Sequence, residues 1–245
     1  MTRADGIRAR NRAAMEAEIL RVAAEELARH GAAALSLRAV AREMGMASSA
    51  IYRYVRDRDE LLTRLIVAAY TSLGDAVDAA HAAVDPADLD GRWWAVGTAL
   101  RDWARSHPHE YALLYGSPVP DYRAPAEQTN EPGTRVQALL VRLLADAQQV
   151  GRLRDAAAGI APGVQVRAEA AAGPLLDDPF FADAGLDAPA VMAGLAAWTL
   201  LLGTVTTELF EQLGDTIPDP DAYFAYMLEV AGRLVLTPAT ATVHS

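Results

Sequence analysis

Apolar residues recur along this chain with the period of an α-helix, and no β-strand pattern is visible. The spacing predicts four helices in the first 80 residues, at about 15–30, 37–44, 48–55 and 57–80. The first has a single apolar face, and Gly31 follows it where a left-handed residue can end a helix. Ser36 is placed to cap the second helix, which Gly45 closes, and Asp57 or Asp59 opens the fourth. The first part of the chain is therefore a small helical head.

The rest of the chain is also predicted to be helical. The expected helices cover about 93–105, 108–115, 134–150, 188–213 and 219–236. Two stretches rich in glycine and proline, 116–133 and 151–187, are predicted to be loops, the second with one short alanine-rich helix. We expect an all-α protein with a small helical domain at 1–60, a larger helical domain at 61–238, and a disordered tail at 239–245.

The composition agrees with a folded protein and excludes several classes of site. Of the 245 residues, 52% are hydrophobic and 22% charged, a globular balance that argues against intrinsic disorder. The absence of cysteine excludes disulfides and thiolate metal sites. No apolar run is judged long enough to cross a membrane, and the N-terminus lacks a signal-peptide core. We therefore expect a cytoplasmic protein with no membrane partner.

Charge is distributed unevenly between the two parts of the chain. The whole chain has a net charge of −10, which on its own argues against nucleic-acid binding. Residues 1–64, however, hold 12 of the 22 basic and 9 of the 32 acidic residues, which leaves this segment positive. All 22 basic residues are arginine. A basic head on an acidic body is consistent with phosphate binding by the head alone.

Residues 36–55, SLRAVAREMGMASSAIYRYV, have the pattern of a helix-turn-helix. Ala41 is small where two helices must approach, and Val40, Met44 and Ile51 supply buried contacts. The second helix presents small and polar residues that suit contact with base edges and phosphates. The candidate DNA-binding residues on the two helices are Arg38, Ser48, Ser49, Ala50, Tyr52, Arg53 and Tyr54. A competing interpretation makes the tyrosines ordinary half-buried aromatics and the arginines a solvated face, and one tyrosine can pack on the core in either case.

Three stretches of the head resemble the DNA-binding domain of tetracycline-repressor-type (TetR family) regulators. They are residues 19–31, 35–55 and 56–62. The family usually has a serine after the turn, a His-Phe pair ending the recognition helix and a lysine opening the next helix. This chain has Ala47, Tyr54 with Val55, and Arg58 at those positions. The absence of a capping side chain at Ala47 transfers that role to Ser48.

The resemblance implies roles for individual residues. Ser36, Tyr52 and Arg58 are expected to contact phosphates, and Ser48, Ser49 and Arg53 to face the groove. A basic arm that reaches neighbouring DNA is an open possibility for the arginines at the N-terminus, Arg3, Arg8, Arg10 and Arg12.

No catalytic constellation is visible in the body. His107 and His109 are two residues apart on an expected helix, too far round it to share a metal ion, and no third ligand is near. Asp219 and Asp221 are better interpreted as loop and N-cap acids than as a catalytic pair. We expect neither an enzyme nor a cofactor.

Aromatic and polar residues set among apolar helices suggest a small-molecule site in the body. The candidates are Trp94, Trp103, Tyr111, Tyr115, Trp198, Thr206 and Glu208. The competing interpretation is a plain aromatic core. Glu208 needs a partner if it is buried, which leaves a ligand, a hydrogen bond across a dimer, or solvent as alternatives.

Residues 107–124 together with 198–214 resemble the C-terminal ligand-sensing domain of an actinobacterial TetR subgroup. This resemblance implies a helical ligand pocket and a homodimer through the last two long helices. Those helices carry more apolar side chains than one small domain needs: Leu195, Leu200, Leu201, Leu202, Val205 and Leu209 on one, and Tyr223, Phe224, Met227, Val230, Leu234 and Val235 on the other.

The sequence therefore predicts a ligand-responsive transcriptional repressor. A dimer would bind a roughly palindromic double-stranded DNA operator, and an unknown small-molecule effector would release it by moving the long helix at 59–80. An activator of the same family is an alternative, as is a helical enzyme or ligand-storage protein.

Overall fold

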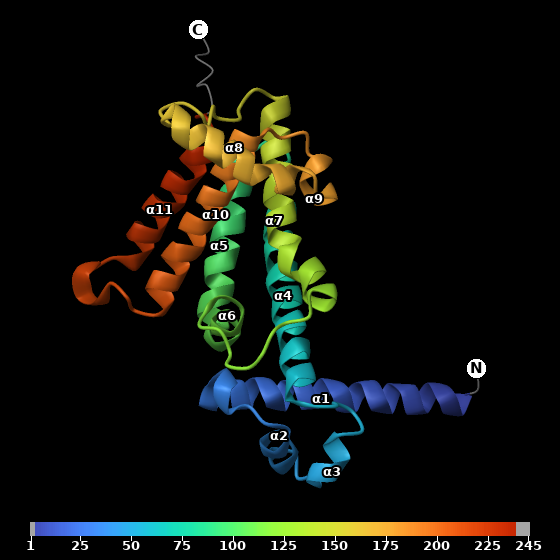
Figure 1. Ribbon diagram of the computed structural model, residues 1–245. Helices are drawn as coiled ribbons and strands as arrows, with labels where there is room; N and C mark the ends of the chain where they lie inside the picture. Colours follow the sequence, from blue (N-terminus) through green and yellow to red (C-terminus); the bar gives the residue numbers. More distant parts are fainter. Residues whose placement is uncertain (1–2, 239–245) are drawn as a thin grey trace. The chain divides into compact units, whose positions relative to one another are not determined.

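Helices connected by loops make up the described part of the chain, residues 3–238 of a computed structural model; nothing is described for the side chains of residues 3–5 and 179–180. Within this range there is no β-strand, only an isolated antiparallel bridge between Leu153 and Leu236. The all-α prediction is confirmed. The helices are α1 (Arg3–Ala34), α2 (Leu37–Glu43), α3 (Ser48–Ile51), α4 (Arg58–Ala82), α5 (Leu89–Ser106), α6 (Pro108–Tyr115), α7 (Ala126–Gln149), α8 (Pro162–Leu176), α9 (Pro179–Ala182), α10 (Ala188–Leu209), a 3₁₀ turn (Gly214–Thr216) and α11 (Pro220–Val235) (Figure 1).

The described chain forms two compact units. The head unit comprises residues 3–73 and 106–133, and the body unit comprises residues 74–105 and 134–238. Helices α4 and α7 each contribute to both units, so contacts divide the chain differently from the expected boundary at residue 60. The functional division into 1–60 and 61–238 stays a prediction, and the tail at 239–245 lies outside the described residues.

In the head unit, α1, α2, α3 and the start of α4 enclose one apolar core. Its members include Ile19, Val22, Leu37, Val40, Ile51, Val55, Leu61, Leu62 and Leu65. Three residues from the second segment of this unit, Leu113, Val119 and Tyr122, pack against the same core. The head core therefore includes part of the chain that follows α5.

Gly31 interrupts α1, as the sequence predicted. Its φ of 74° and ψ of 166° lie outside the helical region, and φ is in the range that favours glycine. At its other end the helix reaches back to Arg3, further than the apolar face required. Ion pairs one turn apart, such as that of Arg12 with Glu16 at 2.9 Å, support this polar extension.

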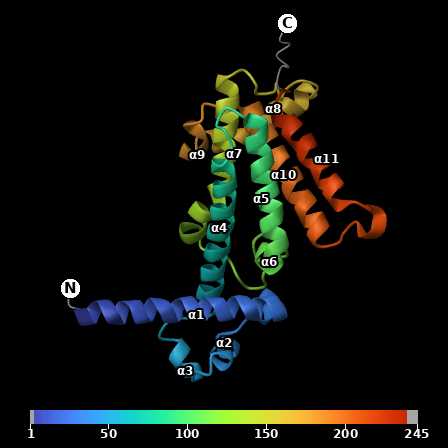
Figure 2. The same ribbon diagram turned by 180° about the vertical axis from the view of Figure 1, so that it is seen from behind.

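In the body unit, α10 packs along α11, and α8 packs against α10 (Figures 1 and 2). The buried Trp93 on α5 donates from Nε1 to the carbonyl of Leu228 on α11, at 2.9 Å. Gly97 and Gly232 make this approach possible, because a Cβ at Gly97 would overlap the side chain of Leu228 and one at Gly232 would lie 2.8 Å from Trp93 Nε1. Close packing of α5 on α11 thus depends on two glycines.

Aspartates begin both of the last long helices. Asp187 and Asp219 each accept a hydrogen bond at 2.9 Å from the backbone N–H three residues on, which confirms Asp219 as an N-cap. Helix α10 is long and apolar enough to meet a membrane-span criterion, contrary to our expectation that no segment would. A core helix of a soluble protein meets the same criterion, because apolar residues surround it on several sides.

Three predictions of secondary structure were wrong. Helix α7 begins at Ala126 and continues through Pro132, so the expected loop 116–133 ends early. The region 151–187 contains the fifteen-residue α8 as well as α9, where one short helix was expected. Helix α3 ends at Ile51, and only residues 52–54 continue it, as a turn. In the first two cases, glycine and proline suggested loops because their local preferences oppose helix, but packing overrides such preferences.

Candidate DNA-binding interface and ligand pockets

The helix-turn-helix is built from a cap, a glycine turn and a small buried contact. Ser36 Oγ accepts from the Ala39 N–H at 3.2 Å and begins α2. Gly45 turns the chain with φ of 65°, and the Met46 N–H donates to the Ala41 carbonyl at 2.9 Å. Ala41 and Ile51 are fully buried where α2 meets α3. Each feature was predicted from the sequence.

The structure leaves most of the candidate DNA-binding side chains at the surface. Ser48, Ser49 and Arg53 are exposed at or just after α3, as is Arg38 on α2. Tyr52 is 50% exposed, whereas Ala50 is half-buried. Because Ile51 anchors α3 to the core, these neighbours point away from it. Together they form a polar, partly basic surface on the head unit.

Tyr54 and Tyr52 have different environments. Tyr54 is half-buried and packs against the head core. The guanidinium carbons of Arg12 and Arg53 lie 5.6 and 5.8 Å from the centre of its ring. Tyr54 thus combines a packing role with two cation–π contacts, which hold one arginine of α1 and one beside α3 near each other.

The guanidinium of Arg58 binds main-chain carbonyls of the segment 32–35. Its Nε donates to the carbonyl of Leu35 at 3.0 Å, and its Nη2 donates to those of Ala32 at 2.9 Å and Ala33 at 3.4 Å. These carbonyls follow the break at Gly31, and that of Ala32 also accepts from the Leu35 N–H at 3.3 Å. The sequence suggested a phosphate contact for Arg58. It gave no sign of these hydrogen bonds, because the carbonyls that accept them lie 23 to 26 residues away.

The arginines of the head unit fall into paired and unpaired sets. Arg12, Arg21, Arg29, Arg56 and Arg64 form ion pairs with neighbouring carboxylates. The pKa of Asp57 is held below its usual value by a hydrogen bond from the Glu60 N–H and by Arg56. Among the described side chains, no ion pair involves Arg8, Arg10, Arg38, Arg42 or Arg53. These five lie on or beside α1, α2 and α3 and are the candidate cations for phosphate. Arg123, exposed in the second segment of the head unit, also forms no ion pair among the described side chains, and the side chain of Arg3 lies outside the described part.

The predicted ligand-binding residues are divided between the units, and each is buried or half-buried. Trp103 and Trp198 are buried in the body unit, and Trp94, Thr206 and Glu208 are half-buried there. Tyr111 and Tyr115 belong to the head unit with Tyr70. Tyr115 meets Tyr70 edge-on with centroids 6.2 Å apart, and the Tyr111 centroid is 5.1 Å away. Burial raises the pKa of Tyr115, so its phenol stays neutral.

Glu208 has a partner within the chain. Arg101 on α5 donates from Nε and Nη2 to the two Glu208 carboxylate oxygens, both at 2.7 Å. Its Nη2 also lies 2.7 Å from Asp221 Oδ1, and its guanidinium covers the Phe224 ring at 4.5 Å. The pKa of Arg101 is raised, chiefly by Glu208. The three partners considered for Glu208 from the sequence omitted this one, because residues 107 positions apart give no local pattern.

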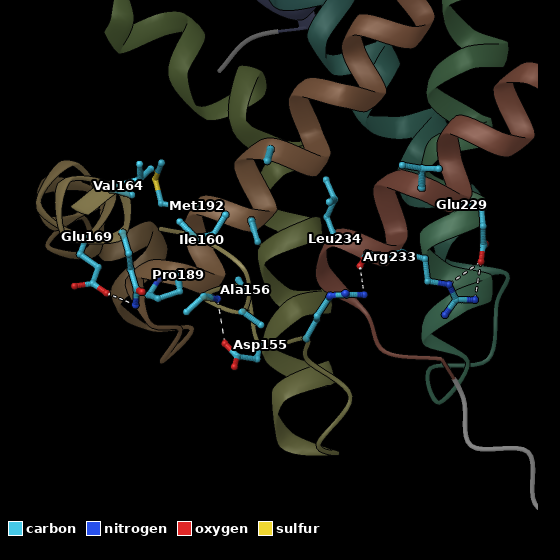
Figure 3. A pocket seen from close by; sticks show the side chains of 18 residues that line it. Asp155, Ala156, Ile160, Val164, Glu169, Pro189, Met192, Glu229, Arg233 and Leu234 are labelled. Carbon is cyan, nitrogen blue, oxygen red and sulfur yellow. Dashed lines mark hydrogen bonds and ion pairs between the residues drawn. The ribbon is translucent and has the colours of Figure 1, made fainter. Parts of the chain in front are cut away.

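The cavities of the body unit include two that its described residues line. The first, of about 600 Å³, is lined by residues 154–160 and by faces of α8, α10 and α11, and we call it the α8–α11 pocket (Figure 3). The second, of about 660 Å³, surrounds the turn between α10 and α11, and Thr207, Glu208 and Tyr223 line part of it. Of the predicted ligand residues, only Glu208 lines either cavity. The sequence missed the α8–α11 pocket because much of its wall comes from the region assigned to loops.

These features define a helix-turn-helix DNA-binding protein with a helical body. Models of two families match: "Bacterial regulatory proteins, tetR family" at residues 19–65 and "Tetracyclin repressor-like, C-terminal domain" at residues 93–231. The HTH-type transcriptional regulator Mb1846 of Mycobacterium bovis is 40% identical over 218 residues, covering 86% of this chain and 87% of its own. The chain belongs to the TetR family, whose members are transcriptional regulators and not enzymes.

Solved structures agree with this assignment. The crystal structure of the protein SCO4313 aligns with a TM-score of 0.71 and 34% identity, over 91% of this chain and 97% of that one. The SmeT–triclosan complex aligns with a TM-score of 0.60 over 92% of this chain and 93% of that one. At 13% identity, the second likeness concerns the fold alone.

Proposed function

We propose that this protein is a ligand-responsive transcriptional repressor that binds a palindromic operator as a dimer and is released by a small-molecule effector. The observation that carries the DNA-binding part is the surface of α3 and its flank. Ser48, Ser49, Tyr52 and Arg53 are exposed there while Ile51 fixes the helix to the core. Short hydroxyl side chains suit base edges, and Arg53 suits a phosphate or a guanine edge.

The arginines without ion pairs support binding to the phosphates of the DNA backbone. Arg38 and Arg42 on α2 join Arg53, and Arg8 and Arg10 extend the basic surface along α1. Each neutralised phosphate releases counterions, so binding should weaken steeply with salt. Tyr52 donates its hydroxyl to phosphate in this proposal, and Ser36 and Ala50 approach the backbone closely.

Exposed apolar and small residues on α10 and α11 support dimerisation through these two helices. Leu201, Val205, Phe224 and Val235, which the sequence assigned to the interface, are buried in the body unit's own core. The remaining surface includes Tyr226, 66% exposed, and Leu234 on α11, with small residues such as Ala196, Thr199 and Gly203 exposed on α10. Small residues let a second pair of helices approach closely in an isologous interface.

Contacts within the head unit suggest how an effector could act on DNA binding. Tyr122 packs on the head core, and its hydroxyl lies 2.9 Å from Thr63 Oγ1 on α4. A molecule that binds two arrangements of this segment unequally would shift the position of the recognition helix. Couplings of about 1–3 kcal/mol are typical of such allostery.

The effector site is proposed among the body-unit residues Trp94, Trp103 and Trp198, with Thr206 and Glu208; Tyr111 and Tyr115, also predicted to bind a ligand, belong to the head unit. The SmeT–triclosan complex supports a small molecule as the effector, since that fold accommodates one. The Arg101–Glu208 pair would then open only if a ligand replaced one partner. Because its proposed target is an operator in DNA, we propose that the protein acts in the cytoplasm.

Fluorescence anisotropy with DNA from upstream of the protein's own gene tests the proposal. Arg53→Ala should weaken binding about tenfold, because one charge-assisted contact of about 1–3 kcal/mol is lost. Arg64→Ala on α4, whose side chain pairs with Glu60 at 2.5 Å, is the matched control and should change affinity less than twofold. Absence of salt-dependent binding at micromolar protein would overturn the operator assignment.

A transcriptional activator is the second candidate, because the surface around α3 would bind DNA in the same way in either kind of regulator. A promoter–reporter assay separates the two. Deleting the gene raises transcription of a repressor's target and lowers that of an activator's target.

A further inference from the structure

The positive charge of the first 64 residues lies before the apolar core of the head unit begins. Residues 1–14 contain four arginines and a single acid, Asp5. Residues 15–64, which hold the helix-turn-helix, contain eight arginines and eight carboxylates. The helix-turn-helix core is therefore formally neutral, although binding to DNA depends on positive charge. The segment that precedes the core supplies the whole positive excess.

This segment is helical although the core does not require it. Helix α1 begins at Arg3, whereas the first fully buried residue among its described side chains is Ile19. Every side chain from residue 7 to residue 14 is exposed. Both ribbon views show this part of α1 running past α3, with no other helix of the head unit alongside it (Figures 1 and 2). Packing within the head unit therefore does not explain the extension.

The extension is connected to the flank of α3 through the ring of Tyr54. The guanidinium carbons of Arg12 and Arg53 lie 5.6 and 5.8 Å from the centre of this ring, within the distance of cation–π contacts. Tyr54 itself packs against the head core, so its ring is fixed relative to α3. It therefore holds an arginine of the extension beside an arginine that is exposed next to α3.

The positive charge gathered here is only partly neutralised within the chain. Arg12 Nε lies 2.9 Å from Glu16 Oε1, in a partly exposed pair one turn apart. Among the described side chains, no ion pair involves Arg8, Arg10 or Arg53. Neighbouring like charges repel one another, and an anion placed near them lowers this repulsion.

The phosphates of a DNA backbone fit this arrangement. A helix of nine residues, such as 3–11, is about 14 Å long. Phosphates follow each strand of DNA about every 3.4 Å along the axis, so the extension can reach phosphates beyond those beside α3. A membrane surface suits it less, because Ile7 is the one large apolar residue in the sequence 3–14 and the extension lacks an apolar face.

We propose that residues 3–14 of α1 are a second DNA-binding element, which contacts backbone phosphates beside the base pairs that α3 contacts. Arg8, Arg10 and Arg12 bind phosphate, and Tyr54 is a positioning residue that holds Arg12 and Arg53 together. The inference rests on the proposed function for an operator, but it concerns phosphates, which carry no sequence information. The extension therefore strengthens binding to any duplex.

Fluorescence anisotropy of the full chain over about 50–200 mM salt tests the extension on DNA from upstream of the gene and on an unrelated duplex. Arg8→Gln with Arg10→Gln should weaken binding to both duplexes by about tenfold or more. It should also lower the slope of log Kd against log salt by about 2 per subunit, since each phosphate contact contributes about 0.9.

Arg21→Gln with Arg29→Gln is the matched control. It removes the same charge from α1, but both of these arginines pair with carboxylates of the chain. It should change affinity less than about threefold and leave the slope unchanged. If the two double variants lower the slope equally, net charge alone acts and the proposal is wrong. An unchanged slope for Arg8→Gln with Arg10→Gln overturns it as well.

Failure of the proposed function gives a different result. A wild type that binds both duplexes equally contradicts the operator, and the salt slopes on either duplex still decide for or against the extension. A wild type that binds neither duplex contradicts both.

Two substitutions of Tyr54 test its positioning role. Tyr54→Leu keeps an apolar side chain without an aromatic face and should weaken binding about threefold, whereas Tyr54→Phe keeps the ring and should restore the affinity. In an Arg12→Gln background Tyr54→Leu should have a smaller effect, because members of one cluster are not additive. Thermal unfolding checks that each variant is folded.

The positioning role is wrong if Tyr54→Phe weakens binding as much as Tyr54→Leu, because the hydroxyl and not the ring would then matter. It is also wrong if the effects of Arg12→Gln and Tyr54→Leu are fully additive.

Discussion

The surface around α3 and the packed helices α5, α10 and α11 use their polar side chains in opposite ways. Arg53 beside α3 is exposed and forms no ion pair among the described side chains, whereas Arg101 on α5 is 8% exposed and contacts Glu208, Asp221 and Phe224. Both arginines occur in helical segments of similar appearance in the sequence. An exposed charge without an ion pair is free to bind a partner outside the chain, whereas a buried charge such as that of Arg101 needs the partners that the fold supplies.

The largest effect is expected at Arg101. Arg101→Ala removes the partner of a half-buried carboxylate and the cation over Phe224, and should lower the free energy of unfolding by about 3 kcal/mol. Arg105→Ala is the control, because Arg105 is exposed and lies 3.5 Å from the same Asp221. Urea unfolding measures both. Equal losses would show that Arg101 contributes no more than a surface charge.

Next in size is the effect of adding a methyl group where α5 meets α11. Gly97→Ala places a Cβ against Leu228 and should destabilise the protein by about 1–3 kcal/mol through overpacking. Gly173→Ala on α8 meets nothing within 4 Å, and should stabilise by up to about 1 kcal/mol from helix propensity. Thermal unfolding should move in opposite directions for the two. A shift in the same direction would contradict the packing shown here.

In the head unit, Ser36→Ala should lower the free energy of unfolding by about 1 kcal/mol, because the first turn of α2 loses its cap. Ser36→Asp supplies another capping oxygen and should restore stability. Chemical denaturation measured without DNA isolates this effect from any phosphate contact. If Ser36→Ala were as stable as the wild type, the Ser36 cap would not contribute to the stability of the head unit.

The smallest effect is a pH dependence at His81. Its Nε2 accepts from Arg92 Nε at 2.9 Å, and burial together with the charge of Arg92 lowers the pKa of His81. The folded protein thus binds this proton less readily than the unfolded chain. Stability is fully present above about pH 6.5 and is lost as the pH falls towards the pKa of the folded state.

Unfolding measured at several pH values between 7.5 and 5.5 checks this expectation. His81→Gln keeps an acceptor for Arg92 without a titrating group, and its stability should fall less over the same interval. Identical profiles for the variant and the wild type would show that other groups cause the dependence.

The parts of the fold that rest on local chemistry could be predicted. The serine cap, the turns at Gly31 and Gly45 and the apolar faces of α1, α2 and α4 are encoded within a few residues of where they act. Exposure of Ser48, Ser49 and Arg53 followed from the same periodicity, because Ile51 faces the core.

Long-range partners and packing against local preference could not be predicted. Arg58 binds carbonyls in the segment 32–35, and Glu208 meets Arg101 on another helix. Helix α8 forms although proline and glycine occur within it, and it contributes one wall of the α8–α11 pocket. In each case the stabilising contact comes from residues distant in sequence.

By itself, the sequence determined the helix-turn-helix, the all-α class and the family, because caps, turns and helical periodicity act between near neighbours. Only the tertiary structure decided which charges remain available. It buried Arg101 against Glu208, used Arg58 to hold the backbone and left Arg53 exposed. The reason is physical. The free energy of a charge depends on its burial and on partners that the chain brings near only when it folds.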